Sequence, residues 1–166
     1  KNFVNHNIPV MGVEPTANTA EEAMKNGVNT VVEFFSDEFA NETFKKVNRQ
    51  ADLIIGNNVL AHVPDINDFT KGLKVLLKAG GTISLEFPHL ANIIKHDQFD
   101  TIYHEHFSYL SLTAVQYIFK KCDLKIINVE EIDTHGGSLR VWGAKYKSAR
   151  PVSETVIDML EVELIA

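Results

Sequence analysis

The sequence predicts an α/β fold with a mostly parallel β-sheet and an antiparallel closing strand. In the first half of the chain, short apolar runs rich in β-branched residues alternate with helical patterns, the order expected of parallel βαβ units. Near the end, two β-rich runs are joined through Gly136 and Gly137, which permit a tight connection. The 166 residues are enough for one domain with its own core.

The parallel part is expected to contain strands at residues 8–13, 28–34, 51–56 and 82–87. Helices are expected at residues 16–26, 37–48 and 65–77, with Thr16 and Asp37 as N-caps and Gly27 closing the first helix. The third helix has Phe69, Leu73, Leu76 and Leu77 at the three- and four-residue spacing of one buried face. Residues 78–81, with two glycines, are expected to form the turn before the strand at 82–87.

After Pro88 the pattern becomes irregular, and a helix is expected at residues 112–121. The two closing β-runs cover residues 124–132 and 139–146, and a last helix is expected at 152–165. That helix has an apolar face made of Val152, Val156, Met159 and Leu160. If exposed, this face suits an interface such as that of a homodimer, or docking on a further domain.

Composition excludes several classes of partner. The 22 acidic and 16 basic residues give a formal charge of −6, and no basic run is long enough to follow a nucleic-acid backbone. No apolar run approaches the roughly 20 residues of a membrane span. The single cysteine, Cys122, allows no internal disulfide and suits a reducing compartment, so we expect a cytoplasmic protein.

The segment 101–109 holds the densest group of proton-handling side chains, Tyr103, His104, Glu105 and His106. Histidine titrates near neutral pH, a carboxylate can orient or charge it, and a phenol can donate to a developing oxyanion. A polar surface loop is the alternative interpretation. His104 and His106 share one face of an extended segment, as in some metal sites, but no third His or Cys lies at ligand spacing, so no metal is expected.

Polar residues also follow the predicted strands, where ligands bind in open α/β sheets. Glu14, Glu33, Asn57 with Asn58, and His62 lie at or after the first three strands. A carboxylate there can accept from two ribose hydroxyls, although Glu14 suits a helix cap equally well.

His89 and His96 are expected to be surface or capping residues, and Trp142 to pack the closing strand. Arg140 suits either a substrate phosphate or a local carboxylate.

Four blocks of the sequence, taken in order, resemble the sugar C-methyltransferases. They are GVEPT (12–16), NNVLAHVP (57–64), FDTIYHEHFSY (99–109) and HGGSLR (135–140). Members of that family use S-adenosylmethionine to methylate C3 of nucleotide-linked 4-keto-deoxysugars. The resemblance implies a Rossmann-like class I methyltransferase sheet and a base that removes the hydrogen next to the ketone.

The resemblance also implies roles for individual residues. His106 would be the base, Glu105 would orient or polarise the site, and Tyr103 and His62 would stabilise the enolate oxygen or hold the sugar. The S-adenosylmethionine residues would be Glu14 for the ribose, Glu33 and Phe34 for adenine, and Asn57 for the methionine portion. His135 and Arg140 are the candidates for binding the nucleotide-sugar substrate.

The chain departs from the family pattern at its start. A class I methyltransferase has a further strand and a glycine-rich loop before the strand at 8–13, and residues 1–7 read instead as the end of the helix that follows that loop. The further strand would lie between those at 8–13 and 51–56. We therefore expect residues 1–150 to be a partial methyltransferase core that binds cofactor weakly and is inactive alone. Residues 151–166 would lead toward an absent C-terminal domain.

Two other function classes remain open at this point. A nicotinamide-dependent oxidoreductase would use a related sheet, with Tyr103 as the acid and Glu14 as the ribose ligand. A non-catalytic interaction module would use the sheet as a docking surface, with the histidine cluster packed and satisfied. The block resemblance alone favours the methyltransferase.

Overall fold

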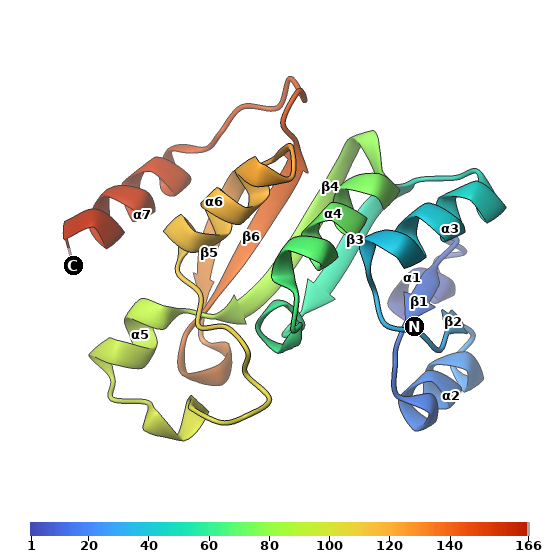
Figure 1. Ribbon diagram of the computed structural model, residues 1–166, viewed down its shortest axis with the longest axis horizontal. Helices are drawn as coiled ribbons and strands as arrows, with labels where there is room; N and C mark the ends of the chain where they lie inside the picture. The colour runs from blue at the N-terminus through green and yellow to red at the C-terminus, as the bar shows by residue number, and fades with distance from the viewer. Residues whose placement is uncertain (166) are drawn as a thin grey trace.

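The computed structural model describes residues 1–165 and shows the predicted α/β fold (Figure 1). Six strands form its sheets: β1 (Met11–Val13), β2 (Asn29–Val31), β3 (Ala51–Asn57), β4 (Leu77–Pro88), β5 (Leu124–Ile132) and β6 (Ser138–Lys145). The α-helices are α1 (Asn2–Asn5), α2 (Ala17–Lys25), α3 (Asp37–Val47), α4 (Ile66–Leu76), α5 (Leu90–Lys95), α6 (Leu112–Lys121) and α7 (Glu154–Ile165). Three short 3-10 turns are η1 (Leu60–His62), η2 (Phe99–Thr101) and η3 (Thr134–Gly136).

The strands form two separate sheets. β1 and β2 pair in parallel, and the second sheet has the order β3-β4-β6-β5. β3 and β4 are parallel, while β6 runs antiparallel to both of its neighbours, which confirms the predicted antiparallel closing strand. β1 and β3, between which the resemblance places a further strand, are both edge strands and are not hydrogen-bonded to each other.

Several predicted strand boundaries are wrong. The strands expected at 8–13 and 28–34 shrink to three paired residues each, because β1 and β2 have only each other as ladder partners. The turn expected at 78–81 lies inside β4. Ala51 pairs with Leu77 but Leu53 pairs with Thr82, so the intervening residues of β4 form a bulge rather than a separate turn.

The core lies between the four-stranded sheet and the helices α4, α6 and α7, which Figure 1 shows side by side. α4 buries the predicted Phe69, Leu73 and Leu76, and Leu77 becomes the first residue of β4. Asp65 caps this helix by accepting from two backbone N–H groups.

The apolar face expected to be free on the last helix is covered by the chain itself. Val156 is 1% exposed, and Met159 and Leu160 pack against the core cluster, because α7 lies on α6 and β5. Of the four residues expected on this face, only Val152 is among the exposed large apolar residues. Within residues 1–165, no helix has the length and apolar character needed to cross a membrane.

Candidate active site

A cavity of about 430 Å³ lies where the carboxyl ends of β3 and β4 meet the irregular segment after α5 and the loop before β6. This is the sheet edge at which the sequence predicted ligand binding. Nine residues line the cavity: Asn58, Pro88, Gln98, Asp100, Thr101, Tyr103, His106, His135 and Gly136. The cavity therefore collects three of the predicted site residues, Tyr103, His106 and His135, from two segments far apart in the chain.

The ring of His106 is held in one orientation by the backbone. Its Nδ1 lies 2.8 Å from the carbonyl oxygen of Thr101. Because a carbonyl oxygen only accepts, we assign the proton to Nδ1, which leaves the lone pair of the neutral ring on Nε2. The hydroxyl of Tyr103 lies 3.2 Å from Nε2 and donates to it. His106 thus presents a basic nitrogen next to a phenol in the wall of the cavity.

The loop that carries His106 is hydrogen-bonded to η1, the short turn after β3. The backbone N–H groups of Phe107 and Ser108 donate to the carbonyl of Ala61, at 2.9 and 3.2 Å. This attachment brings the ring of His62 to 4.6 Å from that of His106, edge to face. The structure therefore places His62 together with Tyr103 and His106, which lie 41 and 44 positions further along the chain.

Glu105 does not join this group. It is exposed, and the structure shows no hydrogen bond or ion pair for its carboxylate within residues 1–165. The neighbouring His104 is also exposed. No group of three His, Cys, Asp or Glu side chains in the described part of the chain is arranged to hold a metal ion.

The predicted cofactor residues lie at the ends of three strands. Glu14 directly follows β1, Glu33 and Phe34 lie in the loop after β2, and Asn57 is the last residue of β3. Oε1 of Glu14 accepts from the N–H of Thr16 at 2.9 Å, but Thr16 is the N-cap residue of α2 and no side chain caps this helix, so the capping alternative for Glu14 is wrong. The ring of Phe34 is 71% exposed. A carboxylate for ribose hydroxyls and an exposed aromatic ring for a base fit an adenosine-containing cofactor.

The two predicted substrate residues have different surroundings. His135 lines the cavity and has a left-handed backbone with φ 51°. Arg140 instead pairs with local carboxylates, with Nη2 3.0 Å from Glu86 and Nη1 2.9 Å from Glu130. The hydrogen bond with Glu86 is the main reason that the pKa of the Arg140 guanidinium is raised. A role for Arg140 with substrate stays a prediction.

Gln98 and Asp100 also line the cavity, although neither was predicted from the sequence. The side chain of Gln98 donates from Nε2 to the carbonyl of Gly136 at 2.7 Å, which ties the two walls together. A Cβ at position 136 would lie 2.6 Å from that nitrogen, and φ there is +75°, so glycine is required. Oε1 of Gln98 and Oδ1 of Asn58 are buried without a partner. In the sequence, the only indication of this role was that Gln98 directly precedes the block FDTIYHEHFSY (99–109).

The position of His89 differs from the prediction. It was expected at the surface or as a cap, but it is 4% exposed and its Nε2 lies 3.0 Å from Glu163 of α7. Its side chain makes no capping hydrogen bond, although it is the N-cap residue of α5. No local pattern reveals a partner that lies 74 residues away.

The fold resembles that of known proteins, and the sequence matches a known family. Residues 1–129 match the family described as a methyltransferase domain. The chain belongs to this family. It is also 37% identical over 154 residues to C-methyltransferase NovU of Streptomyces niveus, a match that covers 93% of this chain and 36% of NovU. The chain thus spans about a third of the length of this curated relative.

Solved structures show the same methyltransferase fold. A SAM-dependent methyltransferase from Anabaena variabilis has a TM-score of 0.65 and 13% identity, covering 86% of this chain and 71% of that one. Magnesium protoporphyrin IX methyltransferase from Synechocystis, solved with bound SAH, has a TM-score of 0.59 and 12% identity, covering 83% and 64%. Membership of this family favours the methyltransferase over the nicotinamide-dependent oxidoreductase.

Proposed function

We propose that this chain carries the reaction site of an S-adenosylmethionine-dependent C-methyltransferase that acts on a nucleotide-linked 4-keto-deoxysugar. The observation that carries the proposal is the orientation of His106, whose Nδ1 proton is held by Thr101 and whose Nε2 faces Tyr103. A neutral imidazole whose positioned nitrogen carries a lone pair is suited to remove a proton at neutral pH once the Tyr103 hydroxyl turns from that nitrogen to the substrate. The similarity to a C-methyltransferase supports carbon as the atom methylated.

The proposed chemistry begins with the sugar carbon next to the ketone. Nε2 of His106 takes its proton, and the electron pair left behind delocalises onto the ketone oxygen as an enolate. The hydroxyl of Tyr103 lies 3.2 Å from the same nitrogen and the ring of His62 lies 4.6 Å from that of His106, so both are the proposed hydrogen-bond donors to that oxygen. His106 carries the proton as an imidazolium and returns it to solvent.

S-adenosylmethionine, when bound, supplies an electrophilic methyl group for the enolate carbon. Glu14, Glu33, Phe34 and Asn57 are the proposed residues that hold it, because they lie at the carboxyl ends of β1, β2 and β3. His135 and Arg140 are the proposed contacts for the nucleotide sugar. A cytoplasmic location and a homodimer stay predictions.

The test is hydrogen exchange at the sugar carbon. The whole protein is incubated in deuterated water with a nucleoside-diphosphate 4-keto-6-deoxyhexose, and deuterium at C3 is followed by NMR. We expect His106→Gln to lower the exchange rate by about 100-fold or more, because general base catalysis contributes roughly that much. His104→Gln, which changes an exposed histidine two residues away, is the matched control. Unchanged exchange in the His106 variant would remove the base assignment.

A further inference from the structure

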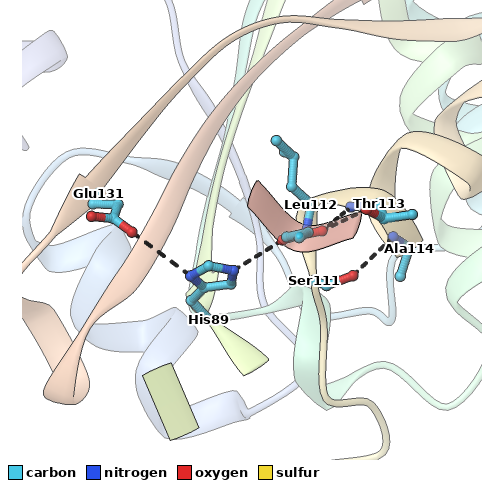
Figure 2. Close-up of polar contacts among 7 residues, drawn as sticks. His89, Ser111, Leu112, Thr113, Ala114 and Glu131 are labelled. Carbon is cyan, nitrogen blue, oxygen red and sulfur yellow. Dashed lines mark hydrogen bonds and ion pairs between the residues drawn. The ribbon is translucent and has the colours of Figure 1, made fainter. Parts of the chain in front are cut away.

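His89 and Glu163 form a buried polar contact between the end of β4 and the last helix. Nε2 of His89 lies 3.0 Å from Oε1 of Glu163, and the two side chains are 5% and 7% exposed. Figure 2 shows the ring of His89 between Glu131 on one side and the start of α6 on the other. Such a contact in the protein interior fixes the elements that carry it, because either partner alone would be left unsatisfied.

Glu163 also holds the N-terminus of α6. Its Oε1 accepts from the N–H of Leu112 at 2.6 Å, and its Oε2 accepts from the N–H and the hydroxyl of Thr113 at 2.8 and 2.6 Å. Ser111, the N-cap residue, satisfies the N–H of Ala114. Burial by itself raises the pKa of Glu163, but the hydrogen bonds from Thr113, Leu112 and His89 together lower it, so the carboxylate is ionised.

His89 connects this contact to the cavity. Since Glu163 accepts, Nε2 of His89 is the donor, and the backbone N–H of His89 donates to the carbonyl of Gly137 at 3.1 Å. Pro88, directly before His89, and Gly136, directly before Gly137, both line the cavity. One wall of the cavity is therefore joined through His89 to α7.

The base is anchored elsewhere. The loop of His106 is held by the carbonyl of Thr101 and by the attachment of Phe107 and Ser108 to Ala61. None of these bonds involves His89 or Glu163. A change at the buried contact should therefore move the wall formed by Pro88 and Gly136 more than it moves His106, which is connected to that wall indirectly, through Gln98 and the backbone at Leu110.

We propose that His89 and Glu163 are positioning residues that set the substrate-binding wall of the cavity through Pro88 and the loop 135–137. The inference deepens the proposed function and rests on it, because it assumes that the nucleotide sugar occupies this cavity. α7 then affects substrate binding without contacting the substrate, because Glu163 holds His89 at the end of β4.

The kinetic test uses the whole enzyme with a nucleoside-diphosphate 4-keto-6-deoxyhexose. We expect His89→Ala and Glu163→Ala to raise KM for the sugar by about tenfold or more, the effect of losing a hydrogen bond to a charged group, with kcat within about twofold. His89→Gln, whose amide can donate in place of Nε2, should restore KM. Glu161→Ala, on the exposed side of the same helix, is the matched control and should behave as wild type.

A second measurement does not depend on turnover. Selective ¹⁵N-glycine labelling of the whole protein reports the amides of Gly136 and Gly137, which we expect to shift in Glu163→Ala but not in Glu161→Ala. If these amides stay in place, or if kcat falls while KM is unchanged, the proposal is wrong. If the wild type does not turn over the sugar, the proposed function fails separately and the glycine signals alone decide the positioning role. Should an alanine variant not fold, Glu163→Asp, with its shorter side chain, is compared with Glu161→Ala instead.

Discussion

Nδ1 of His106 donates to the carbonyl oxygen of Thr101, five residues earlier, and this bond decides which nitrogen of the ring is basic. Because the acceptor is a backbone carbonyl, the tautomer of the neutral ring is set by the fold of the loop. The phenol of Tyr103 then lies 3.2 Å from the other nitrogen. Tyr103 and His106 are the proposed reactive groups of the cavity.

Replacing Tyr103 by phenylalanine tests the role of the phenol. We expect kcat for methyl transfer to fall by about 100- to 1,000-fold, the usual effect of losing one oxyanion donor. Tyr103 is 41% exposed, so stability should change little. Tyr117→Phe, at an exposed position on α6, is the control. A Tyr103→Phe enzyme with the wild-type kcat would show that the phenol does not act in the reaction.

Replacing Arg140 by methionine tests its pairing with Glu86. The side chain of Glu86 is 9% exposed, so loss of the guanidinium leaves a largely buried carboxylate with Thr134 as its remaining donor. We expect the free energy of unfolding to fall by about 1–3 kcal/mol in urea titrations. Lys78→Met breaks the exposed pair with Asp52, which should be worth less than about 1 kcal/mol. Equal effects of the two changes would contradict the structural role of Arg140.

Lowering the pH should lower the free energy of unfolding, because Glu163 becomes protonated. Its pKa is lowered in the folded state, so the stability it contributes is fully present above the ordinary Glu value of about 4.3 and is lost as the pH falls through the folded value. Urea unfolding between neutral pH and about pH 3 measures this loss. Glu163→Gln should be less stable at neutral pH and show a shallower decline, whereas Glu161→Gln should follow the wild type. Parallel curves for the wild type and Glu163→Gln would contradict the assignment.

Replacing Gly72 by alanine tests the contact between α4 and the segment at the start of α3. A Cβ at this position would lie 2.6 Å from the carbonyl oxygen of Ser36 and 2.8 Å from the ring of Phe35. We expect Gly72→Ala to destabilise the protein by about 1–3 kcal/mol. At an open helix position the same change would stabilise by about 1 kcal/mol, so the sign is informative. Gly80→Ala, where a Cβ meets nothing within 4 Å, is the control for thermal unfolding.

Cofactor binding by these 166 residues alone should be weak. Glu14 and Glu33 belong to the two-stranded part and Asn57 to the four-stranded sheet, and the two sheets share no strand pairing. We expect a Kd for S-adenosylmethionine of about 100 μM or weaker by isothermal titration. Low-micromolar binding would show that the two parts are held together well enough without such pairing.

The sequence by itself determined the fold class and the order of most elements. Hydrophobic period, cap residues and the Gly136 and Gly137 connection depend only on near neighbours, so α4, α6, β5 and β6 could be placed closely. The blocks around His62 and His106 were linked through their resemblance to one family, and the structure places the two rings 4.6 Å apart. The ends of β1 and β2 were overestimated, because ladder length depends on which strand lies beside them.

Only the tertiary structure decided which side chains far apart in the sequence contact one another. Arg140 could equally have bound a phosphate, and only the register that places Glu86 and Glu130 beside it shows the carboxylate partners. His89 became a buried donor because α7 returns Glu163 to the end of β4, across 74 residues. Contacts of this range depend on how helices pack against the sheet, and no local sequence pattern encodes that packing.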